Sequence, residues 1–179
     1  MTVLETRRLL LRPFAPSDAR THAALYADPA VTRFLPGGPF SPAVAAERSA
    51  RALARFADHW ERHGWGVWAV VDRASGLVAG QCGLNHLPDG SDVEVLYAFA
   101  AAHWGRGYAT EAARAALGHG FGPVGLERIV AVTSPEHVAS RRVMERLGMV
   151  CEGEREAFGM RMVCYALARG GAARTPAGV

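Results

Sequence analysis

The sequence has few cysteines, no long apolar run and no strong excess of charge, and each absence excludes a class of protein. Cys82, Cys151 and Cys164 are widely spaced without a CxxC pair, so we expect reduced thiols in the core and no metal site. No uncharged apolar run approaches the roughly 18 residues of a membrane helix. Charged residues among the first eight positions argue against a secretory signal. A cytoplasmic location is the default expectation.

The charge balance is also modest. Twenty basic and 17 acidic residues give a formal net charge of +3, and basic residues cluster in pairs at most. This pattern argues against a nucleic-acid partner and is compatible with a small anionic ligand. With 179 residues, half of them apolar, the chain is expected to form one domain over residues 1–169. The Gly-, Ala-, Arg-, Thr- and Pro-rich residues 170–179 are expected to be a disordered tail.

Local patterns predict the order β-α-α-β-β-β-α-β-α-β-β, an α/β domain with a mixed sheet. Capping signals place helices after Pro16 and after Ser41, and an alanine stripe predicts another from Tyr108 to Phe121. Ser134-Pro135 is expected to open the last helix, which ends at Gly148. The strands are expected at residues 9–12, 66–71, 77–84, 93–100, 128–133, 149–156 and 160–168.

The segment Trp104-Gly105-Arg106-Gly107-Tyr108-Ala109-Thr110 joins a buried strand to an amphipathic helix. Two glycines allow a tight turn, and the amides of the helix's first turn together with its dipole favour an anion there. Arg106 can add charge at the same place. We expect a phosphate or pyrophosphate ligand, although many such loops only connect a strand to a helix. The spacing fits neither a nucleoside-triphosphate loop nor a dinucleotide fingerprint.

Five segments in order resemble the GNAT acetyltransferase superfamily, and its ribosomal-protein N-terminal acetyltransferase-like branch in particular, over residues 3–168. They are Leu9-Leu10-Leu11-Arg12-Pro13-Phe14, Trp68-Ala69-Val70, Glu94-Val95-Leu96-Tyr97, the glycine loop followed by Pro135–Arg142 and Leu147-Gly148-Met149, and Tyr165-Ala166-Leu167. The resemblance implies a mixed, mostly antiparallel sheet flanked by helices, with acetyl-CoA as cosubstrate.

The same resemblance implies a cofactor site. Its pyrophosphate would bind the amides of Arg106, Gly107, Ala109 and Thr110, with Gly105 allowing the turn. The pantetheine arm would pair with the main chain of Leu96–Phe99, so that Leu96, Tyr97 and Phe99 contact it in the cleft before residues 128–133. An amide near Leu96 or Tyr97 would polarise the thioester carbonyl.

For the chemistry, an amine must lose a proton and the leaving thiolate benefits from a donor. Glu94, inside an otherwise apolar strand, is the candidate base because desolvation raises the pKa of a carboxyl group. The alternative is a buried Glu paired with a basic neighbour. The resemblance makes Ser140 the candidate acid, since Met144 stands where many relatives have a tyrosine. The alternative for Ser140 is a serine bonded to its own helix backbone, and Tyr97 and Tyr165 are further candidates.

Two residues depart from the branch. His137 replaces an asparagine that helps hold the pantetheine arm, and Arg161 replaces an aspartate of the closing strand. We predict an N-acetyltransferase acting by direct attack of a primary amine, on a protein N-terminus or a small molecule. A non-catalytic acetyl-CoA or amine sensor is the alternative, and a homodimer is left open. Acceptor-site candidates are the apolar residues Phe34, Phe40 and Trp65 and the acidic residues Asp28, Asp92, Glu152 and Glu154.

Overall fold

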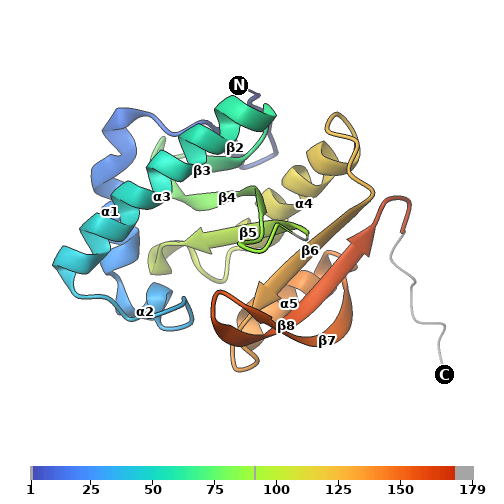
Figure 1. The fold of residues 1–179 in the computed structure, drawn as a ribbon. Coiled ribbons are helices and arrows are strands. Elements are labelled where there is room, and N and C mark those ends of the chain that lie inside the picture. Colours follow the sequence, from blue (N-terminus) through green and yellow to red (C-terminus); the bar gives the residue numbers. More distant parts are fainter. Residues whose placement is uncertain (1, 91, 172–179) are drawn as a thin grey trace.

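A single eight-stranded sheet organises the protein (Figure 1). The structure is a computed structural model and describes residues 2–90 and 92–171. Along the sheet the strand order is β1-β2-β3-β4-β5-β6-β8-β7. All neighbouring strands are antiparallel except β5 and β6, which are parallel. The strands are β1 (Leu4–Glu5), β2 (Leu9–Arg12), β3 (Val67–Asp72), β4 (Val78–His86), β5 (Val93–Phe99), β6 (Arg128–Thr133), β7 (Val150–Ala157) and β8 (Met160–Ala168).

Helices cover both faces of the sheet. In Figure 1, α1 and α3 lie in front of the sheet, and α4 and α5 lie behind it. The helices are α1 (Ala19–Ala27), α2 (Pro29–Thr32), α3 (Pro42–His63), α4 (Tyr108–Phe121) and α5 (Val138–Arg146), with short 3-10 turns at Pro16–Asp18 and Ala101–His103. The main core packs α4 against the sheet, and a smaller core packs α3 against the other face.

The two longest helices show why the sequence folds this way. At the start of α3, the Ser41 side chain accepts a hydrogen bond from the amide of Val44, and Gly64 ends the helix with φ 74°. On α4, Ala112, Ala113 and Ala116 are fully buried. These small side chains let the helix lie close to the sheet.

The structure confirms the predicted mixed sheet flanked by helices and the predicted order of elements, and it adds β1 and α2. Several strand ends shift by one or two residues, and the start of the last helix is wrong. The last helix begins at Val138 and not at Ser134-Pro135. The amide of His137 donates to the carbonyl of Ser134, and the amide of Val138 donates to that of Glu136, so these residues form turns before the helix starts.

The described residues contain no helix that is both long enough and apolar enough to cross a membrane. Most of the tail predicted to be disordered, residues 172–179, lies outside the described residues.

Candidate active site at the opening of the sheet

The sheet opens between β5 and β6. One pair of residues, Glu94 and Val130, joins these parallel strands, near the start of β5. In contrast, β5 pairs with β4 over seven positions from Val93 to Phe99. In the described chain, the rest of β5 therefore has no strand partner on the β6 side. Apart from the Phe99 carbonyl, which Trp104 occupies, its main-chain groups on that edge can pair with an extended ligand.

Strand alternation shows which groups face the opening. The amide of Ala100 donates to the carbonyl of Ala79 at 3.0 Å, which fixes the hydrogen-bonded positions between β4 and β5. These positions alternate along an antiparallel pair, so Leu96, opposite Gly83, directs its main chain toward β4. The amide of Tyr97 consequently points toward the opening. Of the two donors predicted, this geometry favours Tyr97.

The main chain of Phe99 also faces the opening by the same alternation. Its carbonyl accepts a hydrogen bond from the indole Nε1 of Trp104 at 2.7 Å. Trp104 therefore connects the end of β5 to the start of the glycine loop, and the Phe99 carbonyl already has a protein partner.

The glycine loop has the conformation that its sequence predicts. Gly105 and Gly107 have φ of 72° and 77°, and Gly107 is the N-cap of α4. The amide of Glu111 makes the first intrahelical bond, to the carbonyl of Gly107 at 3.0 Å. The three preceding amides, of Tyr108, Ala109 and Thr110, have no intrahelical acceptor. Together with the helix dipole, they form a site for an anion.

A network that the sequence analysis missed anchors this loop to the N-terminal strands. The Arg8 guanidinium donates to the carbonyl of Arg106 at 2.8 Å and pairs with Glu111 at 2.6 Å. The amide of Arg8 and the hydroxyl of Thr6 donate to the same carboxylate. About 100 residues separate the two sides, so no local pattern indicates this contact. The Arg106 side chain itself is exposed, as a ligand-binding cation requires.

Glu94 is 5 % exposed, and burial raises its pKa to about 8. Its side chain shares a face with that of Leu96, which packs against the α3 core, whereas Tyr97 packs into the α4 core. The alternative is that Glu94 pairs with a basic neighbour. Among the described residues, Arg128 and Arg155, the two arginines near the start of β5, pair with Asp92 instead. Glu94 is thus a desolvated carboxyl group on the α1/α3 face.

Ser140 and Tyr97 meet behind the opening. Ser140 lies in the first turn of α5 and is 7 % exposed. The Tyr97 hydroxyl lies 3.1 Å from both the carbonyl oxygen and Oγ of Ser140. A carbonyl can only accept, so the single Tyr97 proton goes to it and the Ser140 hydroxyl donates to Tyr97. Burial raises the pKa of Tyr97, which therefore keeps its proton.

The other candidate tyrosine is held elsewhere. The Tyr165 hydroxyl accepts from Arg141 at 3.2 Å and donates to Glu145 at 3.1 Å. Met144, which occupies the tyrosine position of many relatives, is 2 % exposed and belongs to the main core.

His137 is the N-cap residue of α5. Its Nδ1 is 3.2 Å from the Thr133 hydroxyl, and its ring stacks on Phe34 with centroids 4.2 Å apart. Phe34 follows α2, so this stack joins the α2 loop to the start of α5. Burial, and then the charge of Arg33, lower the pKa of His137, so its neutral form is favoured at neutral pH.

The remaining acceptor-site candidates are mostly engaged in other contacts. Arg161 is exposed and pairs with Glu154. Asp92 and Glu152 both pair with Arg128, while Asp28 caps α2. Trp65 is buried against three histidines at the C-terminal end of α3 and is not part of a rim with Phe34.

A cavity of about 250 Å³ lies between the β4–β5 and β7–β8 connections. Its lining includes Leu87, Asp89, Glu156 and Phe158. Leu87 packs on Val130, the residue opposite Glu94. The cavity is therefore on the same face of the sheet as Glu94. Of its two carboxylates, Asp89 is paired with Arg155 at 3.2 Å, and Glu156 suits a cationic ligand.

Comparisons with known proteins agree with this geometry. Residues 8–150 match the family described as the acetyltransferase (GNAT) domain. The protein YkkB of Bacillus subtilis strain 168 is 34% identical over 152 residues, which cover 83% of this chain and 85% of YkkB. An uncharacterized N-acetyltransferase of Bacillus licheniformis, p20, is 28% identical and covers 86% of this chain, or 85% of its own length.

Solved structures share the fold. An acetyltransferase from Agrobacterium tumefaciens superimposes with a TM-score of 0.83 at 28% identity, covering 93% of this chain and 94% of its own. The ribosomal L7/L12 α-N-protein acetyltransferase RimL, solved in complex with coenzyme A, has a TM-score of 0.77 at 17% identity. The match covers 96% of this chain and 100% of the RimL chain. The latter likeness is one of fold. The matched family and these relatives together show that the chain is a member of the GNAT acetyltransferase family.

Proposed function

We propose that the protein transfers the acetyl group of acetyl-CoA to a primary amine by direct attack of the amine. The observation that carries this proposal is the opening between β5 and β6. It connects unpaired amides at the start of α4 to a desolvated carboxyl group on β5. The residues present fit the cosubstrate, since the loop offers amides for a diphosphate and β5 offers an unpaired edge for an extended arm.

In this proposal the loop and strand position the thioester. The amides of residues 106–110 bind the diphosphate, and Arg106 adds a positive charge. Thr6, Arg8 and Glu111 hold the loop in place. The amide of Tyr97 donates to the acetyl carbonyl and stabilises the negative charge that develops on its oxygen during attack.

Glu94 takes one proton from the ammonium group of the acceptor, directly or through one water, and the neutral amine then attacks. The nitrogen passes its second proton to the departing thiolate or to water as the C–S bond breaks. A carboxylate whose pKa is about 8 is a much stronger base than an exposed one, and part of it is ionised near neutral pH. As the C–S bond breaks, the Ser140 hydroxyl rotates from Tyr97 to the departing thiolate and donates a hydrogen bond to it. Ser140 therefore stabilises the leaving group and does not need to give up its proton.

The acceptor is proposed to enter from the α1/α3 face. The cavity formed by Leu87–Asp89 and Glu156–Gly159 lies on this face, and its Glu156 carboxylate would attract an ammonium group. Asp89 in the same lining is paired with Arg155. A cavity of about 250 Å³ is smaller than a typical drug-sized site and suits the end of a molecule, such as a peptide N-terminus or an aminoalkyl group. The proposed acceptor is thus a cationic primary amine.

A coupled assay tests this function. Purified protein, acetyl-CoA and a panel of N-terminal peptides, amino acids, polyamines and aminoglycosides would be followed by release of free thiol. Mass spectrometry would then locate the acetyl group. The chain contains no lysine, so acetylated lysine side chains of the protein itself cannot contribute, and the exposed Cys151 thiol is subtracted with a protein-only blank. Binding of acetyl-CoA without thiol release on any acceptor would support the sensor alternative. Failure to bind acetyl-CoA would contradict both.

A further inference from the structure

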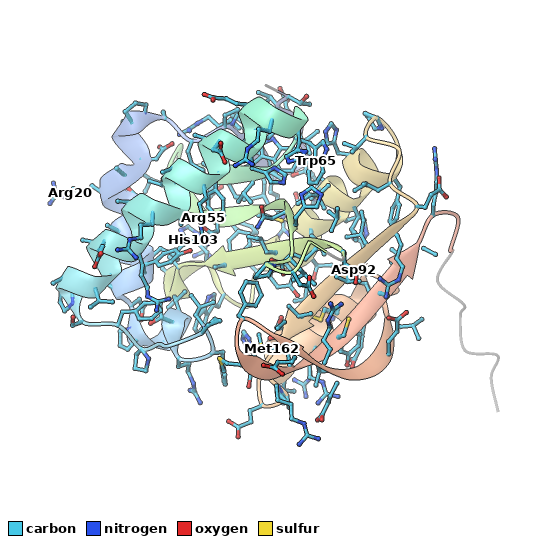
Figure 2. The ribbon with its side chains drawn as sticks, in the orientation of Figure 1. Arg20, Arg55, Trp65, Asp92, His103 and Met162 are labelled. Carbon is cyan, nitrogen blue, oxygen red and sulfur yellow. The ribbon has the colours of Figure 1, made fainter. Side chains whose placement is uncertain are left out.

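Three histidines gather at the C-terminal end of α3, outside the opening between β5 and β6. His59 and His63 lie one turn apart on α3, and His86 is the last residue of β4. Their ligand atoms all lie within 4.8 Å of one another. Trp65, labelled in Figure 2 beside the end of α3, packs against all three rings.

We propose that His59, His63 and His86 form a binding site for one transition-metal ion, with Zn²⁺ as the expected ion. Imidazole nitrogens suit zinc, copper and nickel, whereas magnesium and calcium prefer oxygen ligands. A histidine pair at positions i and i+4 presents both rings on one side of a helix, and the third ring comes from the neighbouring strand. No step of the proposed acetyl transfer uses these residues.

A hydrogen bond to a backbone carbonyl fixes the tautomer of the His59 ring. Nδ1 of His59 lies 2.8 Å from the carbonyl oxygen of Trp65. The carbonyl can only accept, so Nδ1 carries the hydrogen and Nε2 of the neutral ring carries the lone pair. A backbone carbonyl bound to the far nitrogen is the usual second contact of metal-binding histidines, because it orients the ring toward the ion. Nε2 of His59 points toward His86 and accepts a hydrogen bond from its Nδ1, so a bound ion would take the place of the His86 Nδ1 proton.

The distance between the nitrogens also suits a shared ion. Nε2 of His59 and Nδ1 of His86 are 3.1 Å apart. Two nitrogens bound at about 2.0–2.1 Å to a tetrahedral zinc ion lie roughly 3.3–3.4 Å apart, so a small adjustment is sufficient. The third ring, of His63, is exposed and can turn toward the same point. Its exposure leaves the fourth coordination position to water or to an outside ligand.

The surroundings keep the rings neutral, as metal ligands must be. Burial, and then neighbouring imidazoles, lower the pKa of both His59 and His86. Three rings with centroids between 4.4 and 5.3 Å apart would repel one another if they were all protonated. A cation at their centre would instead form three favourable bonds with the neutral rings. It would also tie α3 to β4 and stabilise the folded state through binding.

The test uses the full chain without a histidine tag, in a Cys151→Ser background that removes the one exposed thiol. Titration calorimetry with Zn²⁺ and metal analysis after gel filtration would measure affinity and stoichiometry. We expect one ion per chain and a rise in melting temperature with Zn²⁺ but not with Mg²⁺. His63→Ala removes an exposed ligand with little risk to folding and is expected to weaken binding roughly 10-fold or more.

His103→Ala is the matched control, since His103 is a partly exposed histidine outside the cluster and should leave zinc affinity unchanged. Co²⁺ in place of Zn²⁺ provides a second readout, because a tetrahedral nitrogen site gives intense visible absorption. No bound zinc, or equal zinc affinity in the parent and in His63→Ala, would overturn the proposal. Both measurements are independent of acetyl transfer and of acetyl-CoA.

Discussion

The hydroxyl of Tyr97 lies 3.1 Å from Oγ of Ser140, and this contact joins β5 to α5 behind the opening of the sheet. The contact brings together one hydroxyl group from β5 and one from α5, the elements on the two sides of the opening. Tyr97 also directs its amide into the opening, so a single residue supports two parts of the proposed mechanism.

Removal of either hydroxyl tests this pair. Ser140→Ala is expected to lower kcat roughly 10- to 100-fold, the usual effect of losing a hydrogen bond to a charged group, with KM for acetyl-CoA nearly unchanged. Tyr97→Phe should have a smaller effect, because Ser140 keeps its own hydroxyl. Steady-state kinetics on the best acceptor of the panel would measure both. Full turnover in Ser140→Ala would remove Ser140 from the mechanism.

The proposed base predicts a pH dependence. Glu94 must be ionised to accept a proton, so kcat/KM should rise with pH and level off above a pKa of about 8. Glu94→Gln should lose this inflection and lower the rate roughly 10²- to 10⁴-fold. Asp92→Asn is the matched control, since Asp92 is a nearby carboxylate engaged with arginines. An unchanged pH profile in Glu94→Gln would exclude Glu94 as the base.

The same buried carboxyl group should make stability depend on pH. Between pH about 4.5 and about 8 the unfolded chain has lost the Glu94 proton, whereas the folded protein keeps it. Folding then binds a proton, so the contribution of Glu94 to the free energy of unfolding falls as the pH rises through this range. Melting temperatures at pH 5 and pH 8.5 should therefore differ more in the wild type than in Glu94→Gln. Equal differences would show that Glu94 ionises readily when folded.

The loop can be tested with a pair of glycine variants. Gly107→Ala and Gly76→Ala each place a side chain at positive φ, 77° and 71°, which costs about 1–2 kcal/mol of stability. Gly76 lies in the β3–β4 turn with open space around it, and therefore serves as the control. Both variants should melt at lower temperature, but Gly107→Ala alone should weaken acetyl-CoA binding. Calorimetry with acetyl-CoA would distinguish them.

Much of the fold could be predicted because its signals are local. The alanine stripe of α4 and the apolar run of β6 gave bounds that agree with the structure at both ends. The start of α5 was missed because Ser134-Pro135 looks like a cap, whereas the chain first makes turns up to His137. Desolvation of Glu94 was predictable, since its neighbours in the strand are apolar.

Contacts between distant segments could not be predicted in this way. Nothing near Arg8 in the sequence indicates Glu111, and nothing near Tyr97 indicates Ser140. The histidine cluster is an intermediate case. His59 and His63 have a visible i, i+4 spacing on a predicted helix, but His86 joins them only when β4 is placed beside α3. Trp65, predicted at the acceptor rim, lies in this cluster for the same reason.

Hydrogen–deuterium exchange with and without saturating acetyl-CoA would show whether the cosubstrate binds in the opening between β5 and β6, because it reports on the amides themselves. We expect slower exchange in peptides covering residues 95–110, where Tyr97 and the first turn of α4 would gain acceptors, and no change in the β3–β4 turn around Gly76. Unchanged exchange over residues 95–110 in protein shown to have bound acetyl-CoA would contradict binding in this opening.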